Sequence, residues 1–158
     1  MSGLKALGTG KGEFSMRHEE LIGAWSLESA IAKGTKGDEL LPLGETPGGL
    51  LIYTASGHMA TVLMARGRPK FASGDLRGGT TEEIKQAFEG FDAYAGTYKV
   101  DLEAGTVTHH AEVARFPNWE GTAQVRHMQL HGDRLHLSTT PISVLGQEWV
   151  VSLSWRRT

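Results

Sequence analysis

The chain has 158 residues, of which 39% are hydrophobic and 22% charged, and its formal net charge is −2. This composition is ordinary for a globular protein, and the length suits one domain better than two. The small net charge gives no basic footprint for nucleic acid or for an acidic membrane surface, and a sequence without cysteine excludes disulfides and thiolate-bound metals.

Residues 1–20 are polar and rich in glycine, so we expect a flexible lead-in followed by one domain over residues 21–158. The lead-in holds no apolar core of signal-peptide length, and no run of about 18 apolar residues occurs in the chain. We therefore expect a cytoplasmic protein that does not cross a membrane.

The first strand is predicted over residues 21–31, where apolar residues alternate along one face. A short strand follows near 40–43. Residues 50–53 are then expected to pair with 58–66 across the turn at 54–57, where Gly57 can supply a positive φ. Glycines separate these runs as turns do in antiparallel sheets.

The only predicted helix follows the polar loop at 66–79 and covers residues 80–91. Thr80 and Glu83 fit a capping box, and Gly90 lies where a C-terminal cap would be. An apolar stripe at helical spacing leads us to expect that the helix packs against the sheet. The stripe consists of Ile84, Ala87, Phe88 and Phe91.

Strands resume at 93–102 and 106–114, and further strands are predicted over 122–130, 135–139 and 147–156. The total is eight or nine strands in sequential hairpins with one inserted helix. Such a series favours an all-β, up-and-down antiparallel barrel, because closure removes exposed edges. A barrel of about eight strands has room for side chains or one small ligand. A sandwich is the structural alternative.

The order of several short motifs resembles that of the bacterial and fungal lipocalin-like domain family, over about residues 20–158. The motifs are Gly23-Ala24-Trp25-Ser26-Leu27, Gly49-Leu50-Leu51-Ile52-Tyr53, Gly57-His58-Met59, Tyr94-Ala95-Gly96-Thr97-Tyr98, Val107-Thr108-His109, Pro117-Asn118-Trp119-Glu120-Gly121-Thr122 and Trp155-Arg156. The resemblance implies a calycin-type barrel whose structural residues include Trp25, Trp155 and Arg156.

The resemblance also implies that an arginine of the last strand packs over Trp25, and either Arg156 or Arg157 fits this role. A guanidinium stacked on an indole gains about 1 kcal/mol. The chain departs from secreted lipocalins in its lack of cysteine and in its mid-chain helix. We therefore expect a role inside the cell.

Three residues are the candidates for catalysis. Tyr94 and Tyr98 lie four apart on one strand and so share a face, where they either border a ligand or pack in the core. His109 alternates with Val107, Ala111 and Val113, which places an imidazole on an apolar face. It is either a hydrogen-bonded core residue or the best general acid or base in the chain.

Four further residues are predicted to bind a ligand. Arg126 would anchor a carboxylate or enolate if it points inward, although its mixed strand face slightly favours an outward position. Tyr53 and His58 flank a turn and are expected at a barrel mouth. Trp119 belongs to the loop that follows Pro117.

Other signatures are missing from the sequence. His127, His131 and His136 show no recognisable ligand pattern, so we read them as a polar outer face and predict no metal site. The glycines fit no phosphate-binding loop, and there is no GxSxG elbow. Any enzyme on this chain is expected to be free of cofactors.

Two functions remain open at this point. The chain is either a non-catalytic, intracellular binding protein for a small hydrophobic molecule, or a cofactor-free cyclase or isomerase of polyketide or terpenoid metabolism. The resemblance favours the second marginally, because related barrels include such enzymes, but a fold does not decide function. A barrel filled by its own side chains, acting through protein contacts, is a third possibility. Oligomers are possible, whereas partners among nucleic acids or membranes are not expected.

Overall fold

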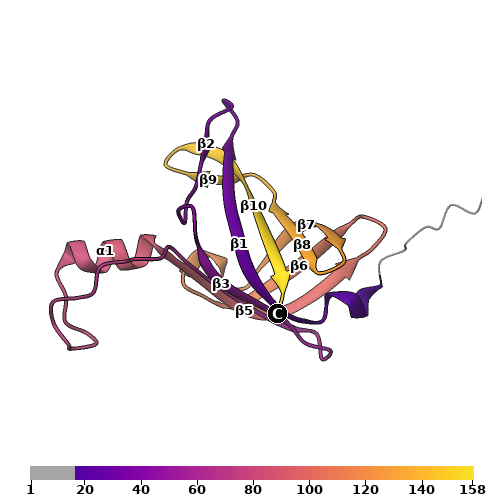
Figure 1. Cartoon of the computed structure of the whole chain (residues 1–158), viewed down its shortest axis with the longest axis horizontal. Coiled ribbons are helices and arrows are strands. Elements are labelled where there is room, and N and C mark those ends of the chain that lie inside the picture. Colours follow the sequence, from indigo (N-terminus) through magenta and orange to yellow (C-terminus); the bar gives the residue numbers. More distant parts are fainter. Residues whose placement is uncertain (1–16) are drawn as a thin grey trace, which may run out of the picture.

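Ten antiparallel strands form one sheet that closes on itself in the computed structural model, which describes residues 17–158 (Figure 1). The strands are β1 (Gly23–Gly34), β2 (Glu39–Leu40), β3 (Gly48–Tyr53), β4 (His58–Met64), β5 (Phe91–Asp101), β6 (Thr106–Ala114), β7 (Thr122–His131), β8 (Arg134–Thr139), β9 (Ile142–Val144) and β10 (Gln147–Arg157). The other elements are the 3-10 helices η1 (His18–Leu21) and η2 (Pro117–Trp119) and the helix α1 (Thr81–Glu89).

The first and last long strands close the barrel. β1 pairs with β10 from Trp25 opposite Arg157 to Gly34 opposite Trp149. Eight strands make the ring, while the short β2 and β9 extend the edges of β1 and β10 beyond β3 and β8. The predicted up-and-down barrel is thus confirmed, and the sandwich alternative is wrong.

Most strand bounds agree with the prediction to within two or three residues, and the differences have local causes. Leu21, expected on the first strand, ends the 3-10 helix η1, and the strand begins at Gly23. β9 was not predicted because it is three residues long and follows Pro141. Residues 1–16 of the predicted lead-in lie outside the described part of the chain, and residues 18–20 belong to η1.

A stacked tryptophan and arginine seal one end of the barrel. The Arg157 guanidinium carbon lies 4.1 Å from the centre of the Trp25 ring, and the Trp25 indole donates to the Leu21 carbonyl oxygen at 3.0 Å. Arg157 also donates to the Ile22 carbonyl oxygen at 2.9 Å. Arg157 is therefore the partner of Trp25. Arg156, the structural residue expected from the terminal motif, lies outside in an ion pair with Glu28.

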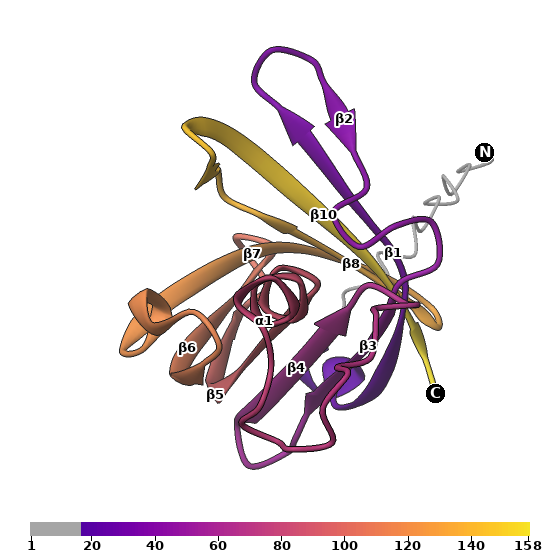
Figure 2. The ribbon, with the colours of Figure 1, turned by 90° about the vertical axis from the view of Figure 1, so that its left-hand side faces the viewer.

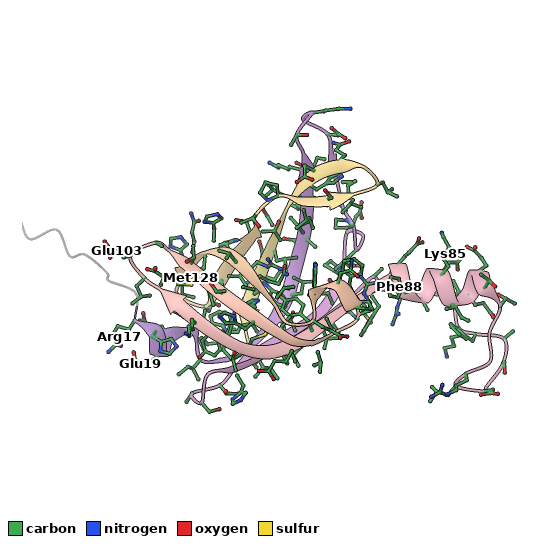
Figure 3. All side chains as sticks on the ribbon, turned by 180° about the vertical axis from the view of Figure 1, so that it is seen from behind. Arg17, Glu19, Lys85, Phe88, Glu103 and Met128 are labelled. Atoms are coloured by element: carbon green, nitrogen blue, oxygen red, sulfur yellow. The ribbon has the colours of Figure 1, made fainter. Side chains whose placement is uncertain are left out.

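The helix α1 projects from the barrel instead of packing on it (Figures 1 and 3). The predicted capping box and Gly90 cap are both present, but Ile84 and Phe88 remain 52% and 46% exposed. The Ala65 amide donates to the Gly90 carbonyl oxygen at 2.9 Å, so the inserted segment leaves and rejoins the β4–β5 hairpin at one rung. This geometry directs the segment away from the sheet. Among residues 17–158, no helix combines the length and hydropathy required to traverse a bilayer.

Candidate functional site

A histidine held between two tyrosines lies inside the barrel. His109 on β6 is 1% exposed, and its Nε2 lies 2.6 Å from the Tyr53 hydroxyl of β3. Its Nδ1 lies 2.7 Å from the Tyr94 hydroxyl of β5. Three strands therefore contribute to one buried polar cluster, the Tyr53–His109–Tyr94 cluster, in an interior that is otherwise mainly apolar.

The cluster contains more polar hydrogens than hydrogen bonds between its members. A neutral imidazole carries one N–H and one bare nitrogen, and each phenol carries one O–H. Three hydrogens thus serve two hydrogen bonds, since one tyrosine donates to His109 and the other accepts from it. The accepting tyrosine keeps its own O–H for another partner. Whether this is Tyr53 or Tyr94 depends on the imidazole tautomer.

Burial keeps all three groups neutral. Burial, together with the positive charges of Arg126 and His110, lowers the pKa of His109 from 6.5 to about 3. Burial also raises the pKa of Tyr53 well above its usual value, and it raises that of Tyr94 against the opposing influence of Arg126. A free imidazolium is therefore disfavoured at neutral pH, and His109 acts as a hydrogen-bond bridge rather than as an independent base.

Arg126 on β7 completes the cluster from inside the barrel. It is 4% exposed, so the outward orientation that its sequence context slightly favoured is wrong. Its guanidinium donates to the Val125 carbonyl oxygen at 3.0 Å and, over a long 3.5 Å, to the Tyr94 hydroxyl. Within residues 17–158, no carboxylate lies close enough to Arg126 to form an ion pair. In the described part of the chain, the barrel thus encloses a positive charge without a matching negative one.

A β-bulge on β6 changes which residues accompany His109. The register between β5 and β6 shifts between Ala95 and Gly96, and Glu112 is the extra residue. Ala114 therefore lies opposite Tyr94, whereas Val113 turns outward and is 62% exposed. The expectation that Val113 shares the inner face with His109 is wrong, because a bulge reverses the alternation beyond it.

Gly96 makes this bulge possible. A Cβ atom at Gly96 would lie 1.9 Å from the carbonyl oxygen of His110, so the two backbones approach more closely than any side chain permits. The close approach of β5 and β6 therefore requires a glycine between Tyr94 and Tyr98.

The catalytic candidate Tyr98 and the predicted ligand residues Trp119 and His58 occupy different positions in the barrel. Tyr98 is buried, but its hydroxyl donates to the Thr54 carbonyl oxygen at 2.8 Å, away from His109. Trp119 of η2 packs edge-on against Tyr94 with ring centres 5.5 Å apart. His58 is exposed and bonds Ser56 in the hairpin turn, so it does not join the cluster.

Tyr53 had been expected at a barrel mouth and instead lies in the core. It pairs with Gly23 at the end closed by η1, and its side chain points inward at 1% exposure. The alternation of Leu51 and Tyr53 on the inner face carries this signal in the sequence. Its contact with His109 has no such signal, because β3 and β6 are not neighbours in the sheet.

Two other polar features concern the interior and the outer face. The buried Trp155 indole N–H is the one buried side-chain donor in the described chain that lacks a hydrogen-bond partner. His127, His131 and His136 are exposed on the outer side. Over residues 17–158, no three His, Asp or Glu side chains gather closely enough to hold a metal ion.

Comparison with known proteins agrees with this architecture. The sequence model of a lipocalin-like domain matches residues 22–158. The chain belongs to this lipocalin-like family. It is also 35% identical over 106 residues to the 4'-hydroxy-3'-methoxypropiophenone carrier protein of Aspergillus oryzae, and the match covers 63% of this chain and 96% of that protein.

Membership of the lipocalin-like family confirms the resemblance found in the sequence motifs. The family match begins one residue before β1 and ends at the last residue, so it covers the whole ring of strands. The carrier from Aspergillus oryzae is named for an aromatic ketone with a phenolic hydroxyl. The chain is therefore a lipocalin-like barrel that has a small-molecule carrier among its relatives.

Proposed function

We propose that the barrel is a small-molecule carrier of secondary metabolism that binds an aromatic, oxygen-bearing compound. The observation that carries this proposal is the Tyr53–His109–Tyr94 cluster, because it leaves one phenol O–H free inside an apolar barrel. A ketone or ether oxygen would accept that hydrogen bond, and an aromatic ring would pack beside Trp119 and Tyr94. The carrier relative is named for a compound with these groups.

Acid–base properties favour binding over catalysis. A general base works best when its pKa lies near the working pH, whereas burial lowers the pKa of His109 to about 3. The cluster therefore orients an acceptor better than it removes a proton.

We also propose a cytoplasmic location, which fractionation of cells expressing the tagged chain would test.

Calorimetry with 4'-hydroxy-3'-methoxypropiophenone tests the carrier function. We expect saturable, one-to-one binding that weakens by about fivefold in Tyr94→Phe, since a hydrogen bond of about 1 kcal/mol is lost. Tyr98→Phe is the matched control, because its hydroxyl is occupied by a backbone carbonyl outside the cluster. Absence of saturable binding to the wild-type protein would refute the proposal.

A cofactor-free isomerase or cyclase is the second candidate, and the imidazole bridge is the observation that favours it. When Tyr53 gives its free proton to a substrate, Nε2–H can pass its proton to Tyr53 while Tyr94 gives its proton to Nδ1. Tyr94, as a phenolate beside Arg126, then takes a proton from another position of the substrate. One proton has then moved within the substrate, as in keto–enol isomerisation, and the imidazole has changed from its Nε2–H to its Nδ1–H tautomer, which must be reversed before the next turnover in the same direction.

Mass spectrometry and NMR of a recovered ligand separate the two functions. A carrier returns the compound unchanged and without exchange of carbon-bound hydrogen for deuterium in heavy water. An isomerase would exchange hydrogen at the carbon next to the ketone, and it would lose this exchange in His109→Gln. Exchange by the wild-type protein at a rate above the buffer reaction would decide for catalysis.

A further inference from the structure

We infer that the barrel holds its ligand as an oxyanion, with the charged oxygen on Arg126 and on the hydroxyl of Tyr94. The inference rests on the proposed binding function and names the ionisation state and class of the ligand: a phenol, enol or carboxylic acid that is bound in its deprotonated form.

The charge inside the barrel is the first reason. Arg126 is 4% exposed, and an arginine side chain carries a positive charge. A buried charge is costly unless a partner compensates it. In the described chain the guanidinium has only the Val125 carbonyl oxygen at 3.0 Å and the Tyr94 hydroxyl at 3.5 Å as partners, and neither carries a negative charge.

The direction of the unused hydrogen bonds is the second reason. One phenol of the cluster has a spare O–H, and Arg126 has N–H groups beyond the two that are bonded within residues 17–158. All of these unused groups are donors. The donors of Arg126 and of the adjoining tyrosine–histidine cluster lie together, and they suit an acceptor-rich, negatively charged group better than an amine.

The orientation of the cluster then follows. Arg126 donates to the Tyr94 oxygen. An oxyanion beside Arg126 accepts from Tyr94 only if the Tyr94 O–H is free. The Tyr94 O–H is free when His109 Nδ1–H donates to the Tyr94 oxygen. Tyr53 donates to Nε2 in this arrangement. We therefore assign His109 in the complex to the tautomer with its proton on Nδ1.

Spectroscopic titration of bound 4'-hydroxy-3'-methoxypropiophenone tests the inference. Phenolates of acylated phenols absorb at longer wavelength than the neutral phenols, so the bound ionisation state is read directly from the spectrum. We expect the pKa of the bound phenol to lie at least one unit below that of the free compound, which corresponds to at least tenfold tighter binding of the anion. A bound pKa equal to or above the free value would overturn the inference.

Matched ligands locate the source of the preference. The methyl ether of this phenol, 3',4'-dimethoxypropiophenone, has no phenolic hydrogen and is expected to bind at least tenfold more weakly than the phenol. In a second arm, 3,4-dimethoxybenzoate is compared with its methyl ester. Preference in the first pair identifies a phenolate ligand, and preference in the second identifies a carboxylate. Equal affinity within both pairs contradicts an oxyanion site, and no binding of any compound refutes the carrier function as well.

Variants of the arginine distinguish recognition from structural support. Arg126→Gln is expected to abolish the pKa shift and the preference for the acidic ligand, while binding of the dimethoxy ketone stays within about twofold. Its melting temperature should equal or exceed that of the wild type, because an uncompensated charge is removed. Lys99→Gln, which removes an exposed cation from β5, is the control for net charge. Equal losses for acidic and neutral ligands in Arg126→Gln would show that Arg126 only supports the fold.

Discussion

Acidification should destabilise this protein through one buried imidazole. In the unfolded chain His109 titrates near 6.5, whereas in the barrel its pKa is about 3. Between these values the unfolded state binds a proton that the folded state does not, so stability is fully present above pH 6.5 and is lost as the pH falls towards 3. One proton corresponds to about 1.4 kcal/mol per pH unit. From pH 7.5 to pH 5.0 the expected loss from His109 is about 2 kcal/mol.

Urea unfolding at several pH values, followed by tryptophan fluorescence, measures this loss. Other groups titrate in the same range, so the relevant quantity is the difference between the wild type and His109→Gln, whose amide offers a donor and an acceptor without titrating. This difference should change by about 2 kcal/mol across the interval. His127→Gln is the matched control for removing an exposed histidine. A difference that stays constant between pH 7.5 and pH 5.0 would refute the assignment of a buried, neutral His109.

Three further substitutions test the close approach of β5 and β6 at Gly96, the closed end of the barrel and the helix cap. Gly96→Ala should lower the free energy of unfolding, measured by urea titration, by more than about 3 kcal/mol, because its Cβ would lie 1.9 Å from a backbone oxygen. In the control Gly74→Ala the new Cβ meets nothing within 4 Å, so the free energy of unfolding should change by less than about 0.5 kcal/mol. Arg157→Met removes the guanidinium stacked on an indole and should cost about 2 kcal/mol in the same assay. Arg156→Met, at an exposed ion pair, should cost clearly less, and equal costs would contradict the closed-end assignment. Thr80→Ala should cost the projecting helix about 1 kcal/mol, seen as faster amide exchange over residues 81–89, and unchanged exchange would contradict the cap.

The architecture was predictable because it depends on local patterns. Alternating apolar residues, glycine turns and a capping box fix strands and a helix within a few residues along the chain. The docking of the helix was not predictable in this way. Its apolar spacing indicates a face to be buried, but the Ala65–Gly90 hydrogen bond returns the segment to the same rung and directs it outward (Figure 1). Figure 2 shows α1 end-on, in front of the strands.

The site was only partly predictable for a related reason. His109 and Tyr94 could be placed on inner faces by alternation, but the bulge at Glu112 breaks that alternation without a composition signal. The pairing of His109 with Tyr53 depends on barrel curvature, which brings together strands that are not adjacent. Arg126 was ambiguous because its neighbours on the strand are mixed, and only the closed barrel shows which side is inside.

Arg157 and Arg126 differ in how far the protein itself satisfies their guanidinium groups. Arg157 lies on the Trp25 ring and donates to the carbonyl oxygens of Ile22 and Glu20, so its guanidinium is satisfied by the protein itself. Arg126 is more deeply buried and has weaker partners. Folding alone would favour an apolar residue at that position. We propose that a ligand completes this cation, so that the charge that is costly for folding supplies the affinity for an oxyanion.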